Sequence, residues 1–434
     1  MKVALINSRQ DKAGLSIRKH IETLLDKRYG NCDRTYSFHD VEGRLIHADG
    51  VDRDIDTDLV IFLSRHASKK PVPVLTVHVT GNLREAELGG SPRTLPPAAP
   101  AMMQAVLREL ASRCPPGYRA AYEVTHHGPT DIVHPSFFVE IGSTEREWAD
   151  ENAGLAVAES VLAAAPADAV PLIGFGGNHY AARQTEISLT SRGAFGHMAH
   201  TREVSLLDAA MVRQMAERSG AKAAYIDRKA LKKEDLLHIG TLLEEEGILR
   251  LSETDLAAMG GLSWETYRGA RELAGAVRAG ARCHVHALSG DIRLETARID
   301  PVLLAETLKA DERFFLSDLE KMPLIHLSGP DNRLLPVFIT SVAYRSGIIN
   351  DLNTLCVKII RNKEITATER DHLIILRTRF DPEKAREQGV PAGPLYRELA
   401  EGRTVEAGGK AITPAMVSKL SEIRIHIPGL ENIA

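Results

Sequence analysis

The chain has 434 residues, 44% of them hydrophobic, which is enough for two or three packed domains. No apolar run approaches the roughly 20 residues that a membrane span needs, so the composition excludes an integral helical membrane protein. The formal net charge of −4 excludes a protein whose main work is coating nucleic acid, because such proteins carry a large basic excess.

Cysteine usage points to a reducing compartment. The four cysteines (Cys32, Cys114, Cys283 and Cys356) are scattered and form no CxxC pair. This spacing argues against a disulfide framework and against a thiolate zinc site. No basic segment followed by a long apolar stretch opens the chain, so we expect no secretory signal and a cytoplasmic protein.

Short apolar runs alternate with helical patterns over the first 250 residues. The predicted strands are 3–6, 59–63, 74–79, 120–124, 137–141, 171–175 and 223–226, and the predicted helices are 16–25, 101–112, 145–165, 206–218 and 233–246. This alternation predicts an α/β fold with a mixed, mostly parallel sheet covered by helices.

Two local signals mark boundaries between these elements. Thr144 and Glu147 have the Ser/Thr-x-x-Glu spacing of a capping box, which predicts a helix start at this point. Residues 91–100 hold four prolines, which lack the N–H that a helix or a central strand requires, so we expect a loop there, with a lid as one possibility.

The character of the sequence changes near residues 247–255. Helical patterns follow at 263–278 and 301–309, and strand-like runs at 283–288, 337–340, 356–360 and 372–376. We therefore predict a first domain over residues 1–252 and a smaller α+β C-terminal domain over residues 253–434.

Histidines gather at the ends of the predicted strands. Eight of the 17 histidines fall between His66 and His200. Ligands of open α/β sheets bind outside the carboxyl ends of the strands, so we expect four strands to bring imidazoles to one edge of one sheet. The candidates are His66, His78, His126 or His127, and His179, with His197 as a further member.

Imidazoles in such a cluster favour zinc or acid–base chemistry. Zinc with three protein ligands and an open position polarises a carbonyl and lowers the pKa of bound water. Glu140 and Glu123 are candidates for a general base or a ligand-orienting carboxylate, and Thr125 for a nucleophile or oxyanion donor. Taken singly, each residue has a plainer interpretation. His78 alternates with valines and is compatible with an outward-facing position on an edge strand, and one member of the pair His126 and His127 with a scaffold role.

Other motifs give less information about function. The sequence contains no G-x-S-x-G elbow, no H-E-x-x-H and no Walker loop. Gly176 and Gly177 follow a strand and are suited to close approach of the backbone to a ligand. Lys69 and Lys70 lie just after His66 and are candidates for phosphate contacts, although a solvated charged face explains such runs more commonly.

Six sequence blocks resemble the archaeal and plant D-aminoacyl-tRNA deacylases. They occur in the family's order and cover about residues 1–252. The blocks are FLSRHASK (62–69), TVHVTGN (76–82), YEVTHHGPT (122–130), PSFFVEIGS (135–143), GGNHY (176–180) and AFGH (194–197). The sequence departs from the family pattern at Asn178 and Ala182, at the rim of the expected site.

The resemblance implies a function. Members of this family cleave the ester that joins a D-amino acid to the 3′ end of tRNA, are zinc-associated with two ions per subunit, and have a fold similar to peptidyl-tRNA hydrolases and purine nucleoside phosphorylases. The substrate usually named is D-tyrosyl-tRNA, whose cleavage recycles mischarged tRNA. The C-terminal 180 residues have no counterpart in shorter members.

The expected site follows from the blocks and the strand ends together. We predict metal ligands among His66, His78, His126 and His179. We predict catalytic roles for Arg65, Thr125, His126, His127 and Glu140, with Arg65 or a backbone N–H near Gly176–Gly177 stabilising the oxyanion and Glu140 or solvent protonating the leaving oxygen. We predict contacts with tRNA or substrate for Lys69, Lys70, Asn82, Gly176, Gly177, Tyr180 and His197.

Alternatives stay open at this point. In a second mechanism the histidines bind RNA, the tRNA 2′-hydroxyl assists, and zinc is structural. A zinc-dependent amidase or esterase acting on small acyl amino acids, or a non-catalytic RNA-binding protein with structural metal, are the rival functions. The oligomeric state, monomer or homodimer, is also open, and no membrane partner is expected.

Overall fold

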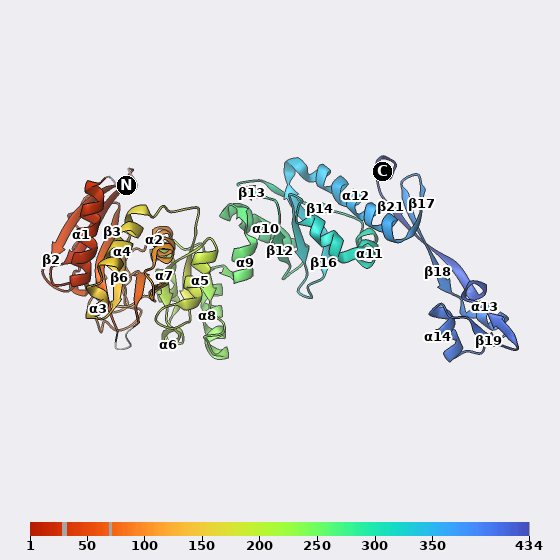
Figure 1. Ribbon diagram of the computed structural model, residues 1–434, viewed down its shortest axis with the longest axis horizontal. Helices are drawn as coiled ribbons and strands as arrows, with labels where there is room; N and C mark the ends of the chain where they lie inside the picture. The colour runs from red at the N-terminus through yellow and green to blue at the C-terminus, as the bar shows by residue number, and fades with distance from the viewer. Residues whose placement is uncertain (28–32, 69–71, 434) are drawn as a thin grey trace. The chain divides into compact units, whose positions relative to one another are not determined.

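The computed structural model describes residues 1–27, 33–68 and 72–433 and divides into two compact units, Met1–Ala257 and Ala258–Ala434 (Figure 1). Strands alternate with helices along the first unit, which confirms the predicted α/β class with mixed, mostly parallel sheets. No helix within these described ranges is long and apolar enough to cross a membrane. Lys69 and Lys70 lie outside the described residues.

The described residues of the first unit form two sheets. The six-stranded sheet has the order β2-β1-β3-β6-β4-β5, and the four-stranded sheet has the order β10-β9-β7-β8. The strands are β1 (Lys2–Ser8), β2 (Thr35–Val41), β3 (Leu59–Ala67), β4 (Val74–His78), β5 (Arg119–Tyr122), β6 (Ser136–Ser143), β7 (Val170–Phe175), β8 (Gly193–Ala199), β9 (Ala223–Ile226) and β10 (Arg250–Leu251).

Strand direction in the six-stranded sheet differs from a simple parallel arrangement. β2, β1, β3 and β6 run parallel to one another, whereas β4 pairs antiparallel with β6 and parallel with β5. β4 is therefore an inner strand, and His78 at its end is fully buried. The interpretation of His78 as a residue pointing out from an edge strand is wrong.

Helices complete the first unit. They are α1 (Lys12–Asp26), α2 (Pro100–Arg113), α3 (Glu145–Trp148), α4 (Glu151–Ala163), α5 (Ala182–Thr190), α6 (Thr201–Val204), α7 (Ala209–Ser219), α8 (Lys233–Glu245) and α9 (Glu253–Ala258). The helix predicted over 145–165 is interrupted, because Ala149 ends α3 and the Asp150 side chain caps α4 by accepting from Asn152 N–H. α1, α2 and α4 pack together and contact the six-stranded sheet, which leaves its other face to a small apolar cluster and to polar side chains.

The second unit is built from helices and from sheets that are mostly antiparallel. Its larger sheets have the orders β12-β15-β16-β14 and β17-β18-β21, and two-stranded pairs β11-β13 and β19-β20 accompany them. The strands are β11 (Gly261–Leu262), β12 (Arg282–Val285), β13 (Ser289–Gly290), β14 (Leu294–Arg298), β15 (Ile325–Ser328), β16 (Leu334–Ser341), β17 (Ile365–Glu369), β18 (His372–Phe380), β19 (Val405–Ala407), β20 (Lys410–Ile412) and β21 (Ser418–His426).

The helices of the second unit pack on these sheets. They are α10 (Trp264–Val277), α11 (Pro301–Leu319), α12 (Arg345–Lys363), α13 (Pro382–Glu387) and α14 (Pro394–Ala400). The strand predicted over 356–360 is wrong, because these residues lie in α12. Their β-branched run continues a helical spacing of buried side chains that begins at Ile348 and passes through Leu352 and Leu355.

The predicted capping box is present. Glu147 accepts from Thr144 N–H at 2.9 Å, and the Thr144 side chain accepts from Arg146 N–H at 3.4 Å. α3 ends at Trp148, whose indole Nε1–H donates to His66 O at 2.9 Å. The cap therefore holds a helix whose last residue contacts the strand that carries His66.

We expect Thr144→Ala to lower the free energy of unfolding of the first unit by about 1 kcal/mol, because it removes the N-cap acceptor. Thr144→Ser keeps a hydroxyl and is the matched control. Urea denaturation followed by circular dichroism measures the difference, and equal stability of the two variants would contradict the assigned cap.

Candidate functional site

His66, His78 and Glu140 lie on one face of the six-stranded sheet. Ser64 on β3 and Thr76 on β4 both pair with Glu140 on β6, and side chains two residues apart on a strand share a face. His66 lies two residues after Ser64, and His78 lies two residues after Thr76. Both rings therefore project from the face that carries Glu140. Because β4 runs against β6, the site occupies the middle of this face, and the predicted position at one edge of one sheet is wrong.

Gly142 makes room for the His66 ring. It pairs with His66 across β3 and β6. A Cβ placed on Gly142 would lie 2.7 Å from His66 Cδ2, which is far too close for a real contact. The absence of a side chain at Gly142 therefore leaves the space that the His66 side chain occupies.

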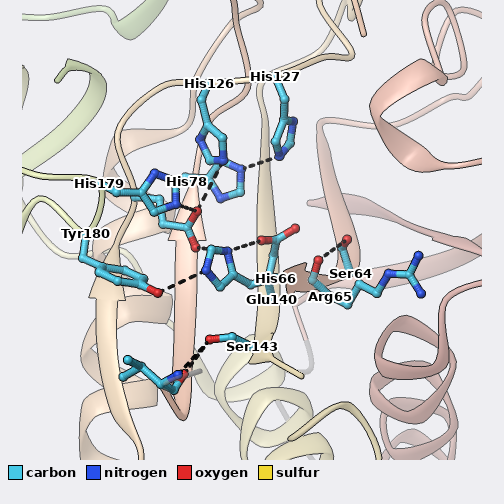
Figure 2. A network of polar contacts seen from close by, with 12 residues as sticks. Ser64, Arg65, His66, His78, His126, His127, Glu140, Ser143, His179 and Tyr180 are labelled. Atoms are coloured by element: carbon cyan, nitrogen blue, oxygen red, sulfur yellow. Dashed lines mark hydrogen bonds and ion pairs between the residues drawn. The ribbon is translucent and has the colours of Figure 1, made fainter. Parts of the chain in front are cut away.

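The segment after β5 brings the side chains of Glu123, His126 and His127 onto this face. Val124 N–H donates to His179 O, and Thr125 N–H donates to Met198 O, both at 2.9 Å. These bonds join the segment to the chain after β7 and to β8 of the second sheet. His126 and His127 follow directly, and Figure 2 shows their rings next to those of His78 and His179.

Glu123 lies at the centre of the cluster and is fully buried. Its Oε1 lies 3.0 Å from His66 Nδ1, and its Oε2 lies 2.9 Å from His179 Nε2 and 3.4 Å from His126 Nε2. Neither oxygen has a hydrogen-bond partner of regular geometry among the described residues. Sequence reasoning left Glu123 undecided, although a carboxylate between apolar residues and a histidine pair was the available signal.

A second group adjoins the first. His78 Nε2 lies 3.2 Å from His127 Nε2, and the His78 ring stacks on the His126 ring with centroids 4.7 Å apart. His126 Nδ1 contacts Val124 O at 2.8 Å and His127 Nδ1 contacts Gly128 O at 2.5 Å. Because a carbonyl accepts only from N–H, both rings carry their proton on Nδ1, and both Nε2 atoms keep a lone pair.

Burial lowers the pKa of three of these histidines, whereas neighbouring carboxylates raise the pKa of the fourth. Burial lowers the pKa of His78 to about 3 and of His127 to about 4, and it holds the pKa of His126 well below its usual range. Burial also opposes protonation of His66, but the Glu123 and Glu140 carboxylates outweigh it and raise its pKa to about 11.

The two carboxylates also differ from each other. Burial raises the pKa of Glu140 to about 7, with the Glu123 charge adding to the effect. Burial opposes ionisation of Glu123 too, yet its contacts with His179 and His66 outweigh burial and hold the pKa of Glu123 well below its usual range. The contact between Glu123 and His66 thus lowers the pKa of the carboxyl and raises the pKa of the imidazole.

The donor set fits a metal ion. Among the residues that the structure describes, three groups have ligand atoms within 4.8 Å of one another. They are His78, His126 and His127; His66, Glu123 and His179; and His78, Glu123 and Glu140. Nδ1 of His126 and of His127 donates to a backbone carbonyl, which is the arrangement that fixes Nε2 as a metal ligand. Glu123, with both oxygens buried and lacking regular hydrogen bonds, is an acceptor that a cation would satisfy.

Two cavities open beside the cluster. The first has a volume of about 440 Å³, the second of about 660 Å³, and His126, His127, His179 and Leu88 line both. A substrate that spans the two cavities would pass over the imidazoles.

The predicted residues Arg65, Tyr180 and Asn82 lie around the histidine cluster and its cavities. Arg65 lines the first cavity and holds its guanidinium 5.0 Å from the Trp148 ring. Tyr180 contacts His66 Nε2 through its hydroxyl at 3.2 Å. Asn82 lines the second cavity and donates through Nδ2 to Gly89 O at 2.9 Å.

Two further predictions need correction. The N–H groups of Gly176 and Gly177 donate to Ala199 O and to Thr201 Oγ1, both at 2.9 Å, so neither is free to stabilise an oxyanion. His197 is fully buried, lies in β8, and lines neither cavity, so it is no substrate contact.

Thr125 and His197 form a support beneath the cluster. His197 Nδ1 lies 3.1 Å from Thr125 Oγ1, and Thr125 Oγ1 accepts from Met198 N–H at 3.0 Å. His197 Nε2 lies 2.9 Å from Pro96 O. The hydroxyl of Thr125 is thus committed to holding the segment that presents His126, which replaces the predicted role as nucleophile or oxyanion donor.

A further histidine group lies in the second unit. His286 Nε2 lies 2.7 Å from His326 Nδ1, and His284 Nε2 lies 2.9 Å from Ser328 Oγ. These nitrogens contact one another or a hydroxyl, and the three rings are not among the groups with metal-binding spacing in the described part of the chain.

Comparisons with known proteins agree on one family. A family model described as D-aminoacyl-tRNA deacylase matches residues 53–250. A D-aminoacyl-tRNA deacylase of Methanoregula boonei is 60% identical over the full length of both chains, and one of Methanoculleus marisnigri is 50% identical over 99% of both.

Shorter proteins match only part of the chain. A D-aminoacyl-tRNA deacylase of Methanosarcina mazei is 38% identical and aligns with 60% of this chain and 95% of its own. The crystal structure of a conserved protein of unknown function is 33% identical, with a TM-score of 0.54, and covers 59% of this chain and 96% of its own.

We expect Thr125→Val to lower the free energy of unfolding by about 1–3 kcal/mol, because the buried His197 Nδ1 and Met198 N–H lose their partner. The exposed Thr241, on α8, is the control, and Thr241→Val should change stability by less than about 0.5 kcal/mol. Chemical denaturation measures both, and equal losses would contradict the assigned role of Thr125.

Proposed function

Because the chain belongs to the D-aminoacyl-tRNA deacylase family and hydrolyses D-aminoacyl-tRNA, we propose that residues 1–252 form its catalytic domain and that zinc is its metal. The observation that supports this most is the convergence of imidazole nitrogens around the buried carboxylate of Glu123. The matched span 53–250 contains every histidine of that cluster.

We assign two zinc ions, one to each histidine group. His78, His126 and His127 would hold one ion, and His66, Glu123 and His179 the other. This adds Glu123 to the ligands expected from sequence and moves His127 into that set. Zinc in such a site polarises an ester carbonyl and lowers the pKa of water that it binds.

The side chains of this chain orient the reaction. Glu123 fixes His66 and His179 by its two oxygens, and the carbonyls of Val124 and Gly128 fix the rings of His126 and His127. We assign to Glu140 the proton that passes to the leaving 3′-oxygen, because this buried carboxyl lines the first cavity and lies beside His66.

Arg65 is the remaining candidate for stabilising negative charge on the carbonyl oxygen. Its guanidinium is held over Trp148 at the wall of the first cavity, whereas the N–H groups of Gly176 and Gly177 are engaged elsewhere. Selectivity for D-amino acids would come from cavity walls that clash with an L side chain. The likeness of fold to peptidyl-tRNA hydrolases and purine nucleoside phosphorylases belongs to the same proposal.

We expect chelation of metal to lower kcat/KM for D-tyrosyl-tRNA by at least about 100-fold and zinc to restore it, because the ester carbonyl then lacks its Lewis acid. L-tyrosyl-tRNA assayed in parallel should stay uncleaved in both states. Full activity after stripping would favour the mechanism in which the tRNA 2′-hydroxyl assists, and equal cleavage of both stereoisomers would contradict a role in proofreading.

We expect Glu123→Gln to reduce bound zinc from two ions per chain and to lower kcat/KM at least about 100-fold, because the amide keeps the shape of the side chain but loses its charge. Glu159→Gln, on α4 beside Arg113, is the matched control and should retain both ions. Elemental analysis of the dialysed proteins gives the metal count. Two ions in Glu123→Gln would exclude Glu123 as a ligand.

A further inference from the structure

The two cavities beside the histidine cluster have different walls, and this inference divides the proposed active site between them. Both reach His126, His127 and His179, where the ester would lie. An aminoacyl-tRNA end has two parts joined by that ester, the amino acid and the terminal adenosine. Each part needs its own cavity, so the question is which part enters which cavity.

The first cavity is walled by buried and apolar side chains. Leu45 and Ile46, in the short helical turn Leu45–His47, are buried, and Trp148 closes another side. Two buried carboxyl groups, those of Asp11 and Glu140, also line it. Arg44 and Arg65 line it as well, so the first cavity combines an aromatic and aliphatic wall with charged groups of both signs.

The second cavity is larger and has an exposed, charged rim. Arg84 and Arg202 are exposed residues of this rim, and the buried Asn82 forms part of its inner wall. The same cavity is also lined by Glu85, Glu87 and Glu203. Guanidinium groups are common phosphate partners, and contacts of this kind position a nucleic acid without reading its sequence.

Substrate connectivity decides between the two orientations. The amino acid is the end of the substrate, so it fits the smaller cavity, where Trp148 supplies an aromatic wall and the Asp11 carboxyl suits its α-ammonium. The adenosine continues through phosphodiesters into the tRNA strand, so it must lie in a cavity with an open rim. We propose that the first cavity receives the amino acid, that the second receives the terminal adenosine, and that Trp148 is a specificity-determining residue for the amino acid side chain.

Trp148 is held in place from three sides. Its indole Nε1–H donates to His66 O at 2.9 Å, the Arg65 guanidinium lies 5.0 Å from its ring, and it is the last residue of the capped helix α3. A fixed aromatic wall favours large apolar or aromatic substrate side chains and leaves a methyl side chain without contact.

The test compares D-tyrosyl-tRNA with D-alanyl-tRNA on the zinc-loaded full chain. Trp148→Ala should lower the ratio of their kcat/KM values about tenfold, because only the tyrosyl ring reaches the missing wall. Trp264→Ala is the matched control, since Trp264 is the other tryptophan of the chain and begins α10 in the second unit. It should leave the ratio unchanged.

Variants at the rim of the second cavity should affect both substrates equally, unlike Trp148→Ala. Arg84→Ala combined with Arg202→Ala should raise KM for both substrates by the same factor, about tenfold at physiological salt, and should weaken the salt dependence of KM, because phosphate contacts are lost. The ratio of the two substrates should stay within twofold of the unaltered protein.

The reverse pattern would overturn the proposal. A ratio unchanged by Trp148→Ala, or one shifted by the arginine variant, would place the amino acid elsewhere. If Trp148→Ala fails to show the native circular dichroism spectrum, Leu45→Ala tests the same wall with the same expectation. Each experiment includes hydrolysis of D-tyrosyl-tRNA by the unaltered protein. A wrong assignment of the two cavities can therefore be distinguished from a wrong proposed function.

Discussion

A carboxylate with no exposure to solvent, that of Glu123, is the constraint on which the rest of the site depends. An isolated charge at such a depth costs several kcal/mol, so it persists only where cations or hydrogen-bond donors surround it. His66, His126 and His179 approach it from different segments of the chain. The fold of the first unit must therefore bring these segments together, or leave a buried charge without partners.

The backbone around Glu123 is organised to present imidazole nitrogens. Carbonyl groups of Val124 and Gly128 take the Nδ1 protons of His126 and His127, and Thr125 is tied below the cluster to His197. A histidine that does not touch the site thus helps to position two that do. The buried polar atoms here contact one another, and their donor set fits a cation, so the cluster differs from an apolar packed core.

The sequence predicted the elements that have a local pattern and missed the features that depend on contacts between distant residues. Strands such as β3, β6 and β7 were predicted because strands buried on both faces are continuous apolar runs. β8 was missed because Gly193–Ala199 has no β-branched residue, and the strand over 356–360 was wrong because a short β-branched run inside a helix has no periodicity of its own. The histidines could be predicted from their places after strands. The reversed direction of β4 could not, because strand direction depends on pairing between distant residues.

The groups with metal-binding spacing differ in the sheets that supply their residues. His78, His126 and His127 come from β4 and from the segment after β5, all within or next to the six-stranded sheet. His66, Glu123 and His179 combine that sheet with the segment after β7 of the other sheet. The second group can form only when the two sheets are joined through the bond from Val124 N–H to His179 O and that from Thr125 N–H to Met198 O. Binding a cation there would stabilise the junction of the sheets as well as the site, because a ligand that binds only the folded arrangement stabilises it by mass action.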